Sequence, residues 1–135
     1  MRIKTFLILC SILFFLYALG GLAFALVPKT TVSLINHIGE CLFGLKPAPL
    51  PESAFFSALA AGMMATIASC MAMVLKNPGG NRSFLIPVVA EKCASSGLGA
   101  LYFLLLDPNA AYLTLFVVDF PLALLTVFLY RVKLR

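Results

Sequence analysis

Four long apolar segments dominate the chain, and shorter, more polar stretches separate them. The segments cover residues 6–27, 53–75, 84–106 and 110–130. Each has about 20 residues, the length at which an α-helix crosses the hydrocarbon core of a bilayer. We therefore predict an all-α integral membrane protein. Residues 1–135 form one transmembrane domain, an antiparallel four-helix bundle in which short loops make consecutive helices neighbours.

The longest stretch between the apolar segments, residues 30–52, has a mixed pattern. We expect its first part to form a short amphipathic helix at the outer membrane interface, ending at Gly44. Prolines then alternate over residues 47–51, which favours an extended connector because proline fixes φ and lacks an N–H donor. The apolar stripe of the expected helix consists of Leu34, Ile35, Ile38, Leu42 and Leu45.

The first apolar segment resembles a signal peptide, because residues 23–25 read Ala-Phe-Ala, a small-x-small pattern. Its apolar run is longer than a signal peptide requires and matches a full span. We expect it to remain uncleaved as the first helix.

The basic residues indicate how the chain is threaded. The composition is 62% hydrophobic and 11% charged, too few charges to cover the surface of a soluble domain. The net charge of +5 comes from residues that flank the spans, so no nucleic-acid partner is expected. The positive-inside rule places both termini in the cytoplasm, and we expect a bacterial inner membrane. The cytoplasmic group is Arg2, Lys4, Lys76, Arg82, Arg131, Lys133 and Arg135; Lys29 and Lys46 fall on the other side.

Three ionisable residues lie inside the apolar segments. Glu91 and Lys92 are adjacent in the third segment, and Asp119 is in the fourth. Counted from the cytoplasmic ends, Lys92 lies about 12 Å deep and Asp119 about 18 Å deep, a difference that a lysine side chain spans. Charges in a membrane are costly without partners, so we predict a Lys92–Asp119 pair. Glu91 would join this network or reach Arg82 or Arg131.

The same face of the third segment carries small and polar residues. Lys92, Ser95, Ser96 and Gly99 follow at helical spacing, and Tyr102 extends the face. Two interpretations remain open. The charges form a structural ion pair that orients two helices, or they form a protonatable site in a polar pocket with Ser95, Ser96, Gly99 and Tyr102.

The second apolar segment is rich in alanine, serine and glycine. Small residues four positions apart allow helix backbones to approach closely, so we expect a packing face there. This face consists of Ala58, Ala61, Gly62, Ala65 and Ser69.

No metal, cofactor or catalytic motif is readable. The four cysteines form no CxxC pair, and the single histidine, His37, has Cys41 four residues later, which is too few ligands for a metal site. We find no nucleophile–base pair or phosphate loop. We therefore expect no cofactor and no independent enzyme activity.

The arrangement resembles the small four-helix membrane proteins called DoxX-like. The resemblance spans most of the chain and rests on GGLAFALVP at residues 20–28, the proline-rich outer loop, the Gly/Ala/Met-rich second helix and Asp119. It implies the four-helix architecture. Some members of that family are associated with oxidoreductase systems, including quinone-linked ones, but no cofactor motif carries over to particular residues of this chain.

These features suggest three functional hypotheses. The first is a small membrane subunit, surrounded by lipid, that assembles with itself or with a larger membrane complex, such as a respiratory or other redox complex. The second is a small transporter or channel that uses Glu91, Lys92 and Asp119. The third is a module that binds a lipid or quinone between the third and fourth helices.

Overall fold

The computed structural model describes residues 1–50 and 54–133, and the described chain is all-α. Four of its helices are long and apolar enough to cross a membrane. The predicted fold class is therefore confirmed. Residues 51–53, from the expected connector and second span, and Arg135 lie outside the described residues. The helices are α1 (Ile3–Leu26), α2 (Pro28–Phe43), α3 (Ala54–Lys76), α4 (Leu85–Leu105) and α5 (Ala110–Arg131), with a 3₁₀ turn, η1, over Arg82–Phe84.

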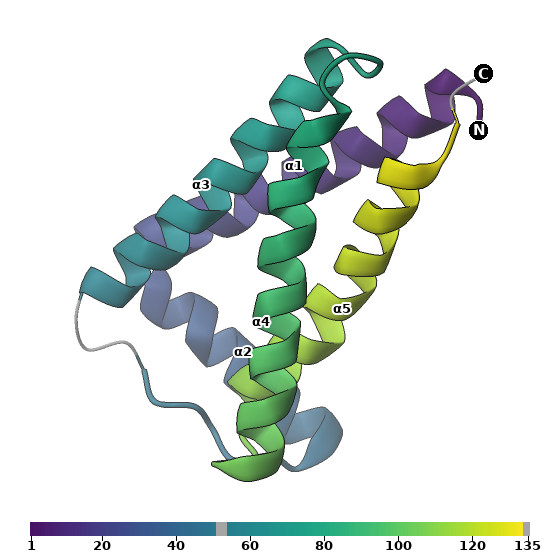
Figure 1. Cartoon of the computed structure of the whole chain (residues 1–135). Helices are drawn as coiled ribbons and strands as arrows, with labels where there is room; N and C mark the ends of the chain where they lie inside the picture. Colours follow the sequence, from purple (N-terminus) through teal and green to yellow (C-terminus); the bar gives the residue numbers. More distant parts are fainter. Residues whose placement is uncertain (51–53, 134–135) are drawn as a thin grey trace.

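The four long helices form two pairs, α1 with α3 and α4 with α5 (Figure 1). The pairs converge at one end, where both termini and the α3–α4 turn lie, and diverge toward the other end. We call these the converging end and the open end. At the converging end the Met1 ammonium group donates a hydrogen bond to the Lys133 carbonyl at 2.9 Å. At the open end α2 crosses from α1 to the start of α5.

The expectation that short loops make consecutive helices neighbours is wrong for most of the length of α3 and α4. A tight turn joins them, yet they contact each other sparsely. The reason lies in their buried faces. α3 buries Ile67, Met71 and Val74 in a core shared with α1, whereas α4 packs Gly99 against α5.

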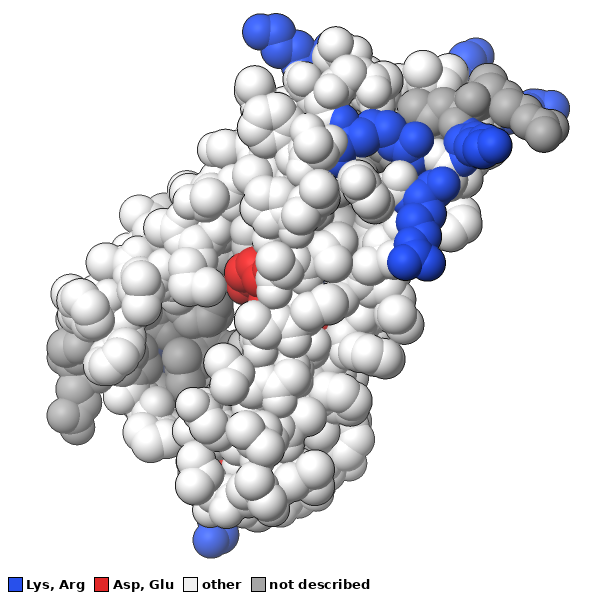
Figure 2. All heavy atoms as spheres, in the orientation of Figure 1, with Lys and Arg blue, Asp and Glu red and all other residues white. Residues whose placement is uncertain are grey.

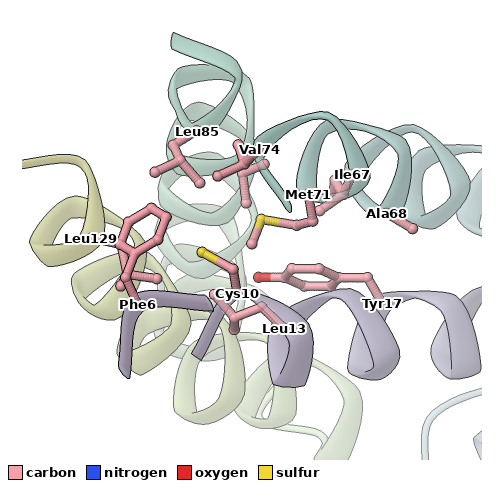
Figure 3. Close-up of a cluster of buried hydrophobic side chains, with 11 residues drawn as sticks. Phe6, Cys10, Leu13, Tyr17, Ile67, Ala68, Met71, Val74, Leu85 and Leu129 are labelled. Carbon is pink, nitrogen blue, oxygen red and sulfur yellow. The ribbon is translucent and has the colours of Figure 1, made fainter. Parts of the chain in front are cut away.

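The hydrophobic core lies toward the converging end (Figure 3). α1 contributes buried residues three or four positions apart, which places them on one helical face. Side chains from α3, α4 and α5 close over this face. The buried cluster comprises Phe6, Cys10, Leu13, Tyr17, Ile67, Ala68, Met71, Val74, Leu85, Val88 and Leu129.

Close helix contacts depend on three glycines. A Cβ at Gly99 would lie 2.8 Å from Leu115 Cβ, and one at Gly39 would lie 2.4 Å from Ala110 Cβ. A Cβ at Gly21 would lie 3.1 Å from Met64 Cβ. Absence of a side chain thus brings α4 and α2 against α5, and α1 against α3.

The expected amphipathic helix corresponds to α2, which begins at Pro28 and ends at Phe43. Gly44 follows with φ 62°, a left-handed conformation that ends the helix. The Asn36 side chain fixes the following segment, because it exchanges two hydrogen bonds with the Ala48 backbone, at 2.7 and 2.8 Å. Leu34, Ile38, Leu42 and Phe43 stay exposed on α2, and the last three line an open pocket of about 310 Å³ between α2 and α5.

Both ends of α5 are held by side chains. Asn109 caps its start by accepting from the backbone N–H groups of Ala111 and Tyr112 at 3.1 and 3.2 Å. At its end, Arg82 donates to the carbonyls of Leu129 and Val132. Most of the basic side chains visible in Figure 2 gather at the converging end.

Candidate functional site

An ion cluster lies between α4 and α5 at the level of Lys92. The Lys92 side chain is 1% exposed. Its Nζ atom lies 3.0 Å from Asp119 Oδ1 and 3.1 Å from Glu91 Oε2. One ammonium group therefore lies against two carboxylates, which come from two different helices.

Two further side chains complete the surroundings of the cluster. The Ser95 hydroxyl donates to Asp119 Oδ2, so both oxygens of that carboxylate are engaged. The Tyr17 ring of α1 lies beneath the Lys92 ammonium group, with Nζ 5.2 Å from the ring centroid. This is a cation–π contact, and its contribution is largest where water is excluded.

The polar atoms of the cluster are incompletely satisfied. Among the described residues, the buried Tyr17 hydroxyl makes no hydrogen bond of good geometry. It points toward Cys10 and Met71 in the core (Figure 3). Glu91 Oε2 is also buried and makes no hydrogen bond of good geometry, although it lies within ion-pair distance of Lys92. A buried polar atom without a hydrogen bond raises the free energy of the folded state. Such atoms are unusual at a site that serves packing alone.

The cluster separates two pockets. Glu91 lines a pocket of about 160 Å³ between α3 and α4, together with Cys70, Pro87 and Val88. Asp119 and Lys92 line a second pocket of about 300 Å³. The other residues around the second pocket are Leu16, Tyr17, Met64, Val117, Val118, Pro121 and Leu122.

Of the four residues expected to form a polar pocket, only Ser95 contacts the cluster. Ser96 is buried and donates to the Cys93 carbonyl of its own helix at 3.3 Å. Gly99 lies in the tight contact with α5, where there is no space for a ligand. Tyr102 is 36% exposed and packs edge-on against Tyr112.

The alternative partners suggested for Glu91 are not its partners in the described chain. Arg82 binds the last carbonyls of α5, and Arg131 is exposed. Glu91 instead pairs with its neighbour Lys92, with Oε2 3.1 Å from Nζ.

The small-residue face of α3 points outward more than expected. Ala58, Gly62, Ala65 and Ser69 are exposed, and Ala61 is half-buried. Together with α1, most of this face lines an open groove of about 630 Å³. The α3 side chains in the groove are Ala61, Gly62, Ala65, Ala68, Ser69 and Ala72.

The His37–Cys41 spacing brings the two side chains together on an exposed turn of α2, with sulfur 3.7 Å from the nearer ring nitrogen. Among residues 1–50 and 54–133, no three His, Cys, Asp or Glu side chains form a group that could hold a metal ion.

Sequence reasoning assigned no role to Tyr17 or Pro121. Tyr17 is a polar aromatic residue in the middle of an apolar span, and that position is a recognisable signal. Pro121 is a helix-interior proline two residues after the charged Asp119. It has no N–H for the carbonyl of Val117, and both residues line the Asp119 pocket.

No protein-family model, curated protein or solved structure matches this chain.

Proposed function

We propose that this small multi-pass membrane protein is a subunit that assembles with further transmembrane helices, in copies of itself or in a larger membrane complex. The open α1–α3 groove carries this proposal. Small residues permit the close backbone approach that drives helix association in lipid, where the hydrophobic effect does not operate between helices. In this chain the small-residue face of α3 is left uncovered on one side.

A second feature supports the same role. The described residues hold no metal cluster, and the ion cluster lies inside the bilayer-spanning helices rather than in a domain that could bind a soluble substrate. The chemistry of an assembly would then come from its partners. The DoxX-like resemblance makes a redox complex of the bacterial inner membrane the partner class that we propose.

Filling the groove tests the proposal. Ala65→Leu places a bulky side chain in the groove, and Ala94→Leu makes the same change on the exposed outer face of α4. Tagged protein is purified from native membranes in mild detergent, and all retained chains are identified by mass spectrometry. We expect the unchanged chain and Ala94→Leu to retain stoichiometric partners or a defined oligomer, and Ala65→Leu to lose them.

A chain that purifies alone as a monomer from its native membrane would overturn the proposal. Equal retention of partners by Ala65→Leu and Ala94→Leu would remove the groove as the contact surface.

A further inference from the structure

The Glu91–Lys92–Asp119 cluster carries a net formal charge, whereas a structural ion pair is neutral. One ammonium and two carboxylates have a formal charge of +1 − 2 = −1. An unbalanced charge in the interior of a membrane protein is costly, and it is reduced when the site takes up a cation. The smallest cation, the proton, needs no coordination shell beyond the carboxylate that binds it.

The other groups around the cluster do not neutralise this charge. α1 contributes Tyr17, and α3 contributes Cys70 on the wall of the Glu91 pocket. α5 contributes Asp119 itself, and α4 contributes the Ser95 hydroxyl. Lys92 is the one cation among the side chains that line the two pockets in the described residues.

The two pockets lie against different helices: the Glu91 pocket is between α3 and α4, and the Asp119 pocket is lined mainly by α1 and α5. The Glu91 pocket includes Pro87, one turn nearer the converging end than Glu91. The Asp119 pocket extends to both sides of Asp119 along α5, from Val117 to Leu122. Each pocket exceeds the volume that one water molecule needs, about 10–15 Å³, and a carboxylate on each wall supplies a polar partner for it. A single ammonium group therefore joins two carboxylates that face different pockets.

We propose that Glu91, Lys92 and Asp119 form a proton relay that carries protons between these pockets. A proton that enters the first pocket binds Glu91. Lys92 then gives one Nζ proton to Asp119, and the resulting neutral amine takes the proton from Glu91. Glu91 is again a carboxylate, Lys92 is again an ammonium group, and Asp119 releases its proton into the second pocket. Proton number and charge balance at each step, and the reverse sequence carries a proton the other way.

Two local features favour transfer over a fixed pair. Nζ is almost equally far from the two carboxylates, at 3.0 and 3.1 Å, and it already donates a hydrogen bond to Asp119. A rotation of the Glu91 side chain, without rearrangement of the helices, aligns the second contact for proton transfer. Pro121 leaves the Val117 carbonyl without its helical N–H partner beside the Asp119 pocket. That carbonyl is an acceptor for water that receives the proton.

The relay is tested with full-length protein in lipid vesicles that enclose a pH-sensitive dye, with a membrane potential set by potassium and valinomycin. We expect proton flux above that of protein-free vesicles. Glu91→Gln and Asp119→Asn keep side-chain shape, and each should reduce the flux to the protein-free level. The matched control is Glu40→Gln, the same change on the exposed surface of α2, which should leave the flux unchanged.

Infrared difference spectroscopy of the unchanged protein gives a second measurement that does not depend on the folding of a variant. Protonation of the cluster should produce a carboxylic acid carbonyl band as the pH falls, and exchange into deuterated water should shift that band. Vesicles no more permeable to protons than protein-free ones would overturn the relay, as would Glu91→Gln and Asp119→Asn variants with unchanged flux. Neither result bears on assembly through the α1–α3 groove, which is measured separately.

Discussion

Lys92 and Asp119 form the one ion pair that joins two helices within residues 1–50 and 54–133. The pair fixes the rotation of α4 relative to α5, because Lys92 is 1% exposed and its ammonium group lies 3.0 Å from Asp119 Oδ1. Ser95 and Tyr17 hold the two partners from either side. The packing of the α4–α5 pair and the chemistry of the cluster therefore depend on the same few atoms.

The α4–α5 contact should be sensitive to one methyl group at Gly99. Gly99→Ala would place a Cβ 2.8 Å from Leu115 Cβ and 2.9 Å from the Tyr112 carbonyl oxygen. We expect a loss of about 1–3 kcal/mol in the free energy of unfolding, as overpacking usually costs. Unfolding in mixed micelles titrated with dodecyl sulfate measures this value. Gly97→Ala is the control, since no atom lies within 4 Å of its Cβ position. An equal effect at both glycines would contradict the close contact.

The docking of α2 against α5 should show compensation between two residues. Gly39→Ala would place its Cβ 2.4 Å from Ala110 Cβ, so we expect α2 to move away from α5. Hydrogen exchange of the α2 amides, measured by mass spectrometry, should become faster. Adding Ala110→Gly removes the opposing methyl group and should restore slow exchange. If the double variant exchanges as fast as Gly39→Ala alone, the contact between these residues does not hold α2 in place.

The positive-inside rule predicts opposite sides of the membrane for Cys41 and the α3–α4 turn. Cys41 is exposed on α2, and Ser83 is exposed in the turn. A membrane-impermeant maleimide added from outside should label Cys41 in sealed cells. It should not label Ser83→Cys in a Cys41→Ser background until the cells are opened. The reversed pattern would place the termini outside.

The spans and the Lys92–Asp119 proximity were accessible from sequence, because both follow from helix geometry. The length of each apolar run defines a helix that crosses a bilayer, and the rise per residue compares the depths of Lys92 and Asp119. The structure places these two side chains together. Ser95 follows Lys92 by three residues, so its position on the same face was also readable.

The position of Tyr17 and the Glu91 pocket depend on how the helices diverge. The depth of a residue along its own helix does not reveal that arrangement. Tyr17 reaches Lys92 because α1 crosses behind α4, a relationship between segments far apart in the chain. The Glu91 pocket exists because α3 and α4 separate beyond their turn. The outward face of α3 also results from how the helices are arranged. Because α1 packs against Ala68 and Met71, Ala65 and Ser69 stay exposed.

The most direct test of the ion cluster is a double-mutant cycle on Lys92 and Asp119. Lys92→Met alone leaves Asp119 buried and Glu91 half-buried without their cation, and should lower the free energy of unfolding by about 3–5 kcal/mol. Lys92→Met combined with Asp119→Leu replaces the pair with apolar side chains and should recover much of that loss. Unfolding of all four proteins in mixed micelles gives the coupling energy. If the double variant recovers free energy of unfolding, Lys92 and Asp119 act as one unit. If the losses of the two single variants simply add, that result contradicts the Lys92–Asp119 pair.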